Sequence, residues 1–180
     1  MSKLIVIIGQ SNGVRMSPYL KSIMPKYLVV NCAKGGSSVD EWQPGDSLYR
    51  NFVNTVNSKK QSGYILSGVC LFQGERDSYE TSIYQKWSDL TMNFLNSFMT
   101  ETNSLGVRIA IAQLGKQPTD RPRPYWKNIQ TQQVSIINRY ENFKLVRTST
   151  ISPYYPSSGP HYSATAYEKI AKLFQQKILE

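Results

Sequence analysis

Four short segments of the sequence hold residue types that nucleophilic catalysis uses. Ser11 lies in Gly9–Gly13, Gly36 in a paired-glycine stretch, Gln73 after a long apolar run, and His161, the one histidine, near the C-terminal end. A serine hydroxyl, a histidine base and N–H donors for a developing oxyanion are the minimum set for acyl transfer. Each segment alone is more often an ordinary turn, and a lone histidine is more often structural. The indication of chemistry therefore comes from finding all four together.

These segments fall where the strands of a parallel sheet would end. Five apolar, β-branched runs span 3–8, 27–32, 64–72, 107–113 and 143–148. Continuous apolar strings of this kind are typical of strands that are covered on both faces. Apolar residues at helical spacing predict helices over 47–60, 79–103 and 125–140, and a last helix that starts near Ser163, a suitable N-cap.

The alternation of strands and helices predicts an α/β fold with one domain over residues 1–180. We expect a three-layer α/β/α sandwich around a mostly parallel five-stranded sheet, similar to flavodoxin-like folds. Such sheets bind their ligands at the carboxyl ends of the strands. Ser11, Gly36 and Gln73 follow the first three strands and His161 precedes the last helix, so this topology places all four at one edge.

Two other uses of these loops fit the sequence less well. Glu75 and Asp77 could form a metal pair, but two carboxylates without a nearby histidine make a poor site. Solvated loop acids are the simpler interpretation of that pair. Gly9–Gly13 could cradle a phosphate or a nucleotide, yet the Gly-Lys-Ser/Thr of a P-loop does not follow it.

Taken in order, the segments resemble the sequence blocks of the SGNH hydrolase superfamily, in particular its sialate O-acetylesterase-like (carbohydrate esterase 6-type) branch. Gly-Gln-Ser-Asn at 9–12, Gly-Gly-Ser-Ser-Val at 35–39 with Trp42, and Gln-Gly-Glu-Arg-Asp at 73–77 match that branch. The stretch 126–133 resembles its Trp-x-x-Ile/Val-Arg-x-x-Gln helix. The similarity runs from residue 4 to about residue 175.

The resemblance implies a role for each matching residue. Ser11 would be the nucleophile, and His161 would be the base that takes the serine proton. The oxyanion hole would consist of the Ser11 N–H, the Gly36 N–H and the Gln73 side-chain amide. Support of the site or contact with substrate would fall to Gln10, Asn12, Gly35, Glu75, Asp77 and Ser158. The resemblance implies no metal and no organic cofactor.

One position departs from the family pattern. The family carries Asp-x-x-His before the last helix, and the aspartate position is Ser158 here. A neutral acceptor stabilises an imidazolium less than a carboxylate does. The sequence therefore predicts a Ser–His dyad. The Ser158 hydroxyl, its carbonyl, or Glu75 or Asp77 from another loop could orient His161.

Composition limits the partners more than it identifies them. The 21 Lys and Arg exceed the 12 Asp and Glu, for a formal charge of +9, which favours anionic partners. The basic residues are scattered, so specific binding of nucleic acid is not expected. The loop 118–126, with its basic and aromatic residues Arg121, Arg123, Tyr125 and Trp126, could line a sugar site, although Trp126 also suits helix packing.

The cysteines and the N-terminus bear on the compartment. Cys32 and Cys70 lie in apolar runs, which predicts buried free thiols rather than a disulfide framework. The apolar run Leu4–Ile8 is too short for a signal peptide, and no apolar stretch approaches the length of a membrane span. The chain is therefore expected to be cytoplasmic as encoded, with delivery outside the cell by a larger assembly left open. The sequence leaves the oligomeric state open as well.

These features together predict a serine esterase that hydrolyses an O-acetyl or other small acyl ester on a carbohydrate. The alternative from another class is a catalytically weak or inactive module that keeps the fold and binds an anionic glycan or nucleic acid. Ser158 favours this alternative. The joint presence of Ser11, Gly36, Gln73 and His161 opposes it, because a binding module needs no nucleophile.

Overall fold

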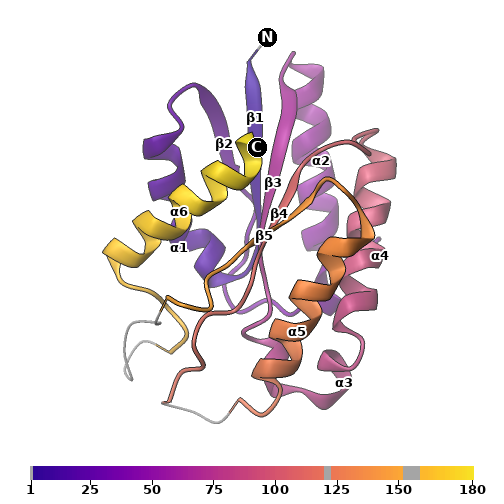
Figure 1. Cartoon of the computed structure of the whole chain (residues 1–180). Coiled ribbons are helices and arrows are strands. Elements are labelled where there is room, and N and C mark those ends of the chain that lie inside the picture. Colours follow the sequence, from indigo (N-terminus) through magenta and orange to yellow (C-terminus); the bar gives the residue numbers. More distant parts are fainter. Residues whose placement is uncertain (1, 120–122, 152–158) are drawn as a thin grey trace.

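A five-stranded parallel sheet forms the centre of the molecule in the computed structural model, which describes residues 2–119, 123–151 and 159–180 (Figure 1). The strands are β1 (Lys3–Gly9), β2 (Tyr27–Asn31), β3 (Ile65–Phe72), β4 (Ile109–Ala112) and β5 (Phe143–Val146). Their order in the sheet is β2-β1-β3-β4-β5, and every neighbouring pair is parallel. The predicted strand positions and the parallel sheet are confirmed.

Helices cover both faces of the sheet. The elements between the strands are α1 (Ser11–Ile23), η1 (Val39–Trp42), α2 (Ser47–Gln61), η2 (Asp77–Tyr79), α3 (Thr81–Tyr84), α4 (Trp87–Glu101), α5 (Trp126–Ile136), η3 (Ile137–Arg139) and α6 (Ala164–Leu179). Helices α1 and α6 pack on one face, and α2, α4 and α5 pack on the other (Figure 1). This is the predicted three-layer α/β/α sandwich.

Successive side chains of the buried strands point to opposite faces of the sheet, where they contribute to two separate apolar layers. In β1, Leu4, Val6 and Ile8 enter the layer under α2, α4 and α5, which contains Phe52, Phe94 and Phe98. Ile5 and Ile7 enter the layer under α1 and α6. Because both faces of the strand are buried, β1 reads as a continuous apolar run.

Two helix predictions need correction. The stretch 79–103 is not one helix, because the backbone turns extended at Glu80 (φ −113°, ψ 121°) and α4 begins only at Trp87. Helix α1 was not predicted as a helix. Its first turns contain Asn12, Gly13 and Pro18, residue types of low helix propensity that hide the pattern of its buried residues.

Two smaller expectations are confirmed by the described residues. Cys32 and Cys70 are buried free thiols, as predicted, and burial raises the pKa of both. Ser163 caps α6 by accepting a hydrogen bond from the Ala166 N–H at 3.1 Å. Among the described residues, none of the helices is long and apolar enough to cross a membrane.

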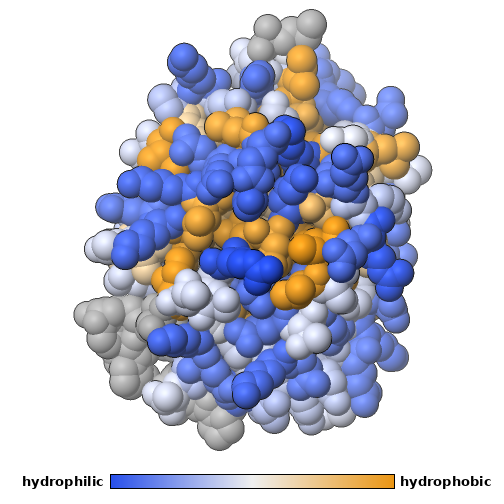
Figure 2. All heavy atoms as spheres, in the orientation of Figure 1, coloured by the Kyte–Doolittle hydropathy of each residue, from blue (hydrophilic) through white to orange (hydrophobic). Residues whose placement is uncertain are grey.

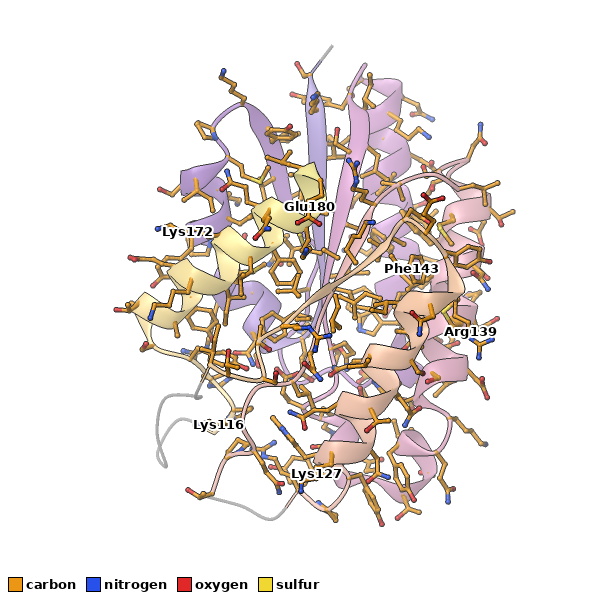
Figure 3. The ribbon with its side chains drawn as sticks, in the orientation of Figure 1. Lys116, Lys127, Arg139, Phe143, Lys172 and Glu180 are labelled. Carbon is orange, nitrogen blue, oxygen red and sulfur yellow. The ribbon has the colours of Figure 1, made fainter. Side chains whose placement is uncertain are left out.

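One apolar patch interrupts the mostly hydrophilic face that the figures show. Figure 2 shows hydrophilic residues over most of this face, with an apolar patch in the middle over β5. A groove there is lined by residues of β5 and its neighbours, including Ile137, Phe143, Leu145 and Leu173. The labelled cations Lys116, Lys127, Arg139 and Lys172 come from different elements and lie apart (Figure 3).

Candidate active site

The turn between β1 and α1 places Ser11 at the carboxyl edge of the sheet. Gly9 ends β1 with φ +103°, and a Cβ there would lie 2.1 Å from the carbonyl oxygen of Phe72, so only glycine fits. This close approach lets the Gln10 N–H donate to the Phe72 carbonyl at 2.8 Å. Helix α1 then starts at Ser11, which is half-buried. Its N–H belongs to the first helical turn, where amides have no intrahelical acceptor.

His161 reaches this serine from the other end of the chain. Its Nε2 lies 3.0 Å from Ser11 Oγ, although the two residues are 150 positions apart in sequence. The imidazole stands in the loop between β5 and α6, two residues before the Ser163 cap. The structure thus brings together the predicted nucleophile and the predicted base at hydrogen-bond distance. Ser158, one of the residues that the sequence offers for orienting His161, lies outside the described residues.

The first of the two glycines after β2 lies near Ser11. A Cβ built on Gly35 would lie 3.9 Å from Ser11 Cβ, so Gly35 lies beside the serine with room for its missing side chain between them. Gly36 is exposed and has φ +74°, a left-handed conformation that glycine adopts without strain. The loop therefore brings backbone close to Ser11, as an oxyanion site needs. The contribution of the Gly36 N–H itself remains a prediction.

Gln73 does not present the free amide that the sequence predicted. The residue is only 1% exposed, and its Nε2 donates to the Ser37 carbonyl and to Asp77 Oδ2, both at 2.9 Å. An amide nitrogen has two hydrogens, so both are used inside the protein. In this geometry Gln73 holds the glycine loop through Ser37 instead of donating to an oxyanion.

Glu75 holds the turn that carries the serine. It is 2% exposed, Oε2 accepts from Gln10 Nε2 at 2.5 Å, and Oε1 accepts from Asn12 Nδ2. The two residues that flank Ser11 are thus attached to one carboxyl group. Burial raises the pKa of Glu75 to about 7, against the lowering effect of the Asn12 hydrogen bond. The predicted supporting role of Gln10, Asn12 and Glu75 agrees with these contacts.

Asp77 holds the loop that carries the glycines. It is fully buried, and Oδ1 accepts from Ser38 Oγ at 2.8 Å and from the Val39 N–H at 2.9 Å. Its Oδ2 accepts from Gln73 Nε2 and, at 2.8 Å, from Trp87 Nε1. Burial raises the pKa of Asp77, while these four hydrogen bonds act to lower it.

A metal site at these carboxylates has no support in the geometry. All four oxygens of Glu75 and Asp77 accept hydrogen bonds from N–H or O–H groups. Residues 2–119, 123–151 and 159–180 contain no group of three or more His, Cys, Asp or Glu side chains that could hold an ion.

The aromatic and basic residues of the loop before α5 that the structure describes pack against the protein instead of lining an open sugar site. Trp126 is 2% exposed and its Nε1 donates to the Gly115 carbonyl at 2.9 Å, which is the packing alternative. Arg123 is also buried, with its guanidinium 4.6 Å from the Tyr79 ring centroid. Tyr125 stacks on Tyr84 with 3.9 Å between ring centroids. Arg121 lies outside the described residues.

Gln133 supports the site, although the sequence patterns placed it only in a predicted helix and indicated no role for it. Gln133 is fully buried in α5, donates from Nε2 to the Gln73 carbonyl at 2.9 Å, and accepts from the Leu114 N–H at 2.7 Å. Gly74 makes room for it, because a Cβ at Gly74 would lie 2.9 Å from Gln133 Nε2. Helix α5, which corresponds to the predicted helix over 125–140, therefore fixes the tip of β3.

Several solved structures share this fold. A protein from Arabidopsis thaliana aligns over 95% of this chain and 68% of its own, with a TM-score of 0.78 at 18% identity. A carbohydrate acetylesterase from Xanthomonas citri aligns over 97% and 55%, with a TM-score of 0.74 at 11% identity. A GDSL-like lipase from Parabacteroides merdae aligns over 98% and 95%, with a TM-score of 0.71 at 9% identity. The fold is that of the SGNH/GDSL hydrolases.

A match to a family model identifies the family to which this chain belongs. Residues 21–180 match the carbohydrate esterase family described as sialic acid-specific acetylesterase, and the chain belongs to that family. The matched range starts after Ser11. A probable carbohydrate esterase from Arabidopsis thaliana is 35% identical over 49 residues, which cover 27% of this chain and 19% of that protein. The chain also spans only 55% of the Xanthomonas acetylesterase.

Proposed function

We propose that this chain is a serine esterase that removes an O-acetyl or other small acyl group from a carbohydrate hydroxyl. The observation that carries the proposal is the 3.0 Å separation of Ser11 Oγ from His161 Nε2. A serine within hydrogen-bond distance of an imidazole is the arrangement that activates the hydroxyl. Membership in the carbohydrate esterase family supports the ester substrate.

The reaction follows from the two side chains. Ser11 Oγ attacks the ester carbonyl carbon while its proton passes to His161 Nε2. The resulting oxyanion lies near the Ser11 N–H and the backbone of the glycine loop. The tetrahedral intermediate then expels the sugar alcohol, which takes the proton from His161 Nε2. Water, deprotonated by the same nitrogen, hydrolyses the acyl-serine and restores the enzyme.

The charge near Ser11 favours an anionic sugar. Arg15 lies one helical turn beyond the serine, and Lys34 precedes Gly35 in the glycine loop; both are exposed. Arg76 is exposed too, but it pairs with Glu80 at 2.7 Å. We therefore propose that Arg15 and Lys34 attract a carboxylate-bearing glycan such as a sialylated or uronic one.

Acetate release from a panel of O-acetylated sugars tests the function. The wild type should release acetate, and Ser11→Ala should lose at least 10³-fold in rate. Ser58→Ala removes an exposed hydroxyl from α2 and serves as the matched control with unchanged rate. Activity should survive EDTA, since the proposed steps use no metal.

Two results would contradict the proposal. Loss of activity with EDTA would indicate metal-assisted chemistry. No release by the wild type, together with saturable binding of an anionic glycan, would favour the non-catalytic binding module instead.

A further inference from the structure

Asn12 connects the serine turn to the histidine loop. It directly follows Ser11, is fully buried, and uses both hydrogens of its side-chain amide. One goes to Glu75 Oε1 and the other to the carbonyl oxygen of Pro160, 3.0 Å away. Pro160 directly precedes His161. The residue next to the nucleophile is therefore bonded to the residue next to the base.

Tyr167 completes the connection on the other side of the histidine. Its hydroxyl, on the first turn of α6, donates to Asn12 Oδ1 at 2.6 Å. The Tyr167 hydroxyl oxygen also accepts a hydrogen bond from the N–H of Tyr162 at 3.3 Å. Tyr162 directly follows His161. Hydrogen bonds thus fix the main chain on both sides of His161, at Pro160 and at Tyr162. The first comes directly from the Asn12 amide, and the second is linked to that amide through the Tyr167 hydroxyl.

We propose that Asn12 and Tyr167 are positioning residues that set the distance between Ser11 Oγ and His161 Nε2. This inference rests on the proposed function. Moving either loop relative to the other would break at least one of the three contacts. A shift of about 1 Å between reacting groups can lower a rate roughly 10²-fold. The chain holds its nucleophile and base on segments that are far apart in sequence, so it needs such a connection.

Glu75 fixes which way round the Asn12 amide stands. In its ionised form Glu75 accepts hydrogen bonds and does not donate them, so it selects the NH₂ side of the amide. The carbonyl side then faces the Tyr167 hydroxyl. All polar atoms of the Asn12 side chain are used, as expected of a buried amide network that specifies one arrangement.

The first experiment compares two tyrosines on neighbouring helices. Tyr167→Phe removes the hydroxyl that links Asn12 to Tyr162. Tyr19→Phe is the matched control, because its ring stacks on that of Tyr167 at 5.8 Å and its hydroxyl takes no part in the network. We expect kcat for aryl acetate to fall roughly 10- to 100-fold in Tyr167→Phe with KM unchanged, and to stay at the wild-type value in Tyr19→Phe.

A double-mutant cycle separates positioning from a general structural effect. If Tyr167 acts through His161, then adding Tyr167→Phe to His161→Ala should cost no further activity. An additional loss of the same size in both backgrounds would overturn the inference. If Tyr167→Phe does not fold, Asn12→Ser tests the same connection from the serine side, with the same cycle.

A spectroscopic measurement makes the inference independent of turnover. His161 is the only histidine, so its ring resonances need no assignment. They should shift in Tyr167→Phe and stay in place in Tyr19→Phe. If the wild type lacks esterase activity, the proposed function fails while these resonances still test the connection. Unchanged resonances and an unchanged rate in folded Tyr167→Phe would overturn the inference and leave the proposed function standing.

Discussion

Glu75 and Asp77 stand two residues apart after β3, and each holds one of the two loops that frame Ser11. Asp77 receives four hydrogen bonds, two on each oxygen, which use the roughly four lone-pair sites of an ionised carboxylate. Glu75 receives one side-chain hydrogen bond on each oxygen. A proton can therefore join Glu75 without displacing a donor, whereas at Asp77 it would have to displace one.

The different numbers of hydrogen bonds at Asp77 and Glu75 indicate different roles for the two carboxyl groups. Asp77 gives the glycine loop a fixed shape through Ser38, Val39 and Gln73, and its four hydrogen bonds are ones that an ionised carboxylate accepts. Glu75 holds Gln10 and Asn12, and burial keeps its pKa near neutrality. We expect the glycine loop to depend on the four hydrogen bonds of Asp77, and the serine turn to respond to the protonation of Glu75.

The largest effect is expected from Asp77→Asn. The amide keeps one oxygen for two donors, but its NH₂ group faces the two remaining N–H donors. Each buried donor without an acceptor costs about 1–3 kcal/mol, so the free energy of unfolding should fall by about 2–6 kcal/mol. Urea unfolding at pH 8 measures this. A loss below about 1 kcal/mol would mean that the four donors are satisfied in some other way.

The pH dependence of stability comes next. The folded-state pKa of Glu75 is about 7, above the ordinary value of 4.5, so the folded protein holds this proton between those pH values and the unfolded chain does not. The free energy of unfolding should therefore decrease as pH rises from about 4.5 to about 7, by an amount on the order of 3 kcal/mol from this group. Urea unfolding across pH 5–8 checks the slope.

Glu75→Gln provides the control for that slope and a prediction of its own. The variant cannot titrate at this position, so its stability should vary less between pH 5 and 7. Its NH₂ group would face Gln10 Nε2 or Asn12 Nδ2, which loosens the serine turn. We expect about tenfold lower kcat at pH 8. The same pH slope as the wild type would contradict the assignment of the proton to Glu75.

The smallest effect belongs to Ser38→Ala. It removes one of the four donors to Asp77 and leaves the other three in place. A hydrogen bond to a charged group contributes about 1.5–3 kcal/mol, but burying an alanine there offsets part of the loss, so we expect about 1 kcal/mol. Urea unfolding at pH 8 measures the change, and a loss as large as that of Asp77→Asn would contradict the account of three remaining donors.

The sequence predicted the parts of the molecule that repeat a simple physical pattern. Continuous apolar runs located all five strands, and their alternation with helices implied the parallel sheet that brings Ser11 and His161 together. Helix α1 escaped notice because Asn12, Gly13 and Pro18 disfavour helix locally. The buried positions of Asn12 and Gly13 became clear only with tertiary contacts.

The sequence predicted which residues lie at the site better than it predicted what each residue does there. Gln73 was expected to donate to an oxyanion, yet its two N–H groups meet Ser37 and Asp77. Residue type shows what a side chain can donate, but not which acceptor it will meet once the loops close. For the same reason no pattern in the sequence indicated that Tyr167, on the last helix, donates a hydrogen bond to Asn12.

The central claim is that Ser11 is a nucleophile activated by His161, and covalent labelling by a fluorophosphonate tests it most directly. Mass spectrometry after reaction at pH 8 should find one adduct, on the peptide that contains Ser11. Labelling should be absent in Ser11→Ala and slower by at least 100-fold in His161→Ala. No adduct on folded wild-type protein, or an adduct on Ser11 at the same rate without His161, would contradict the account.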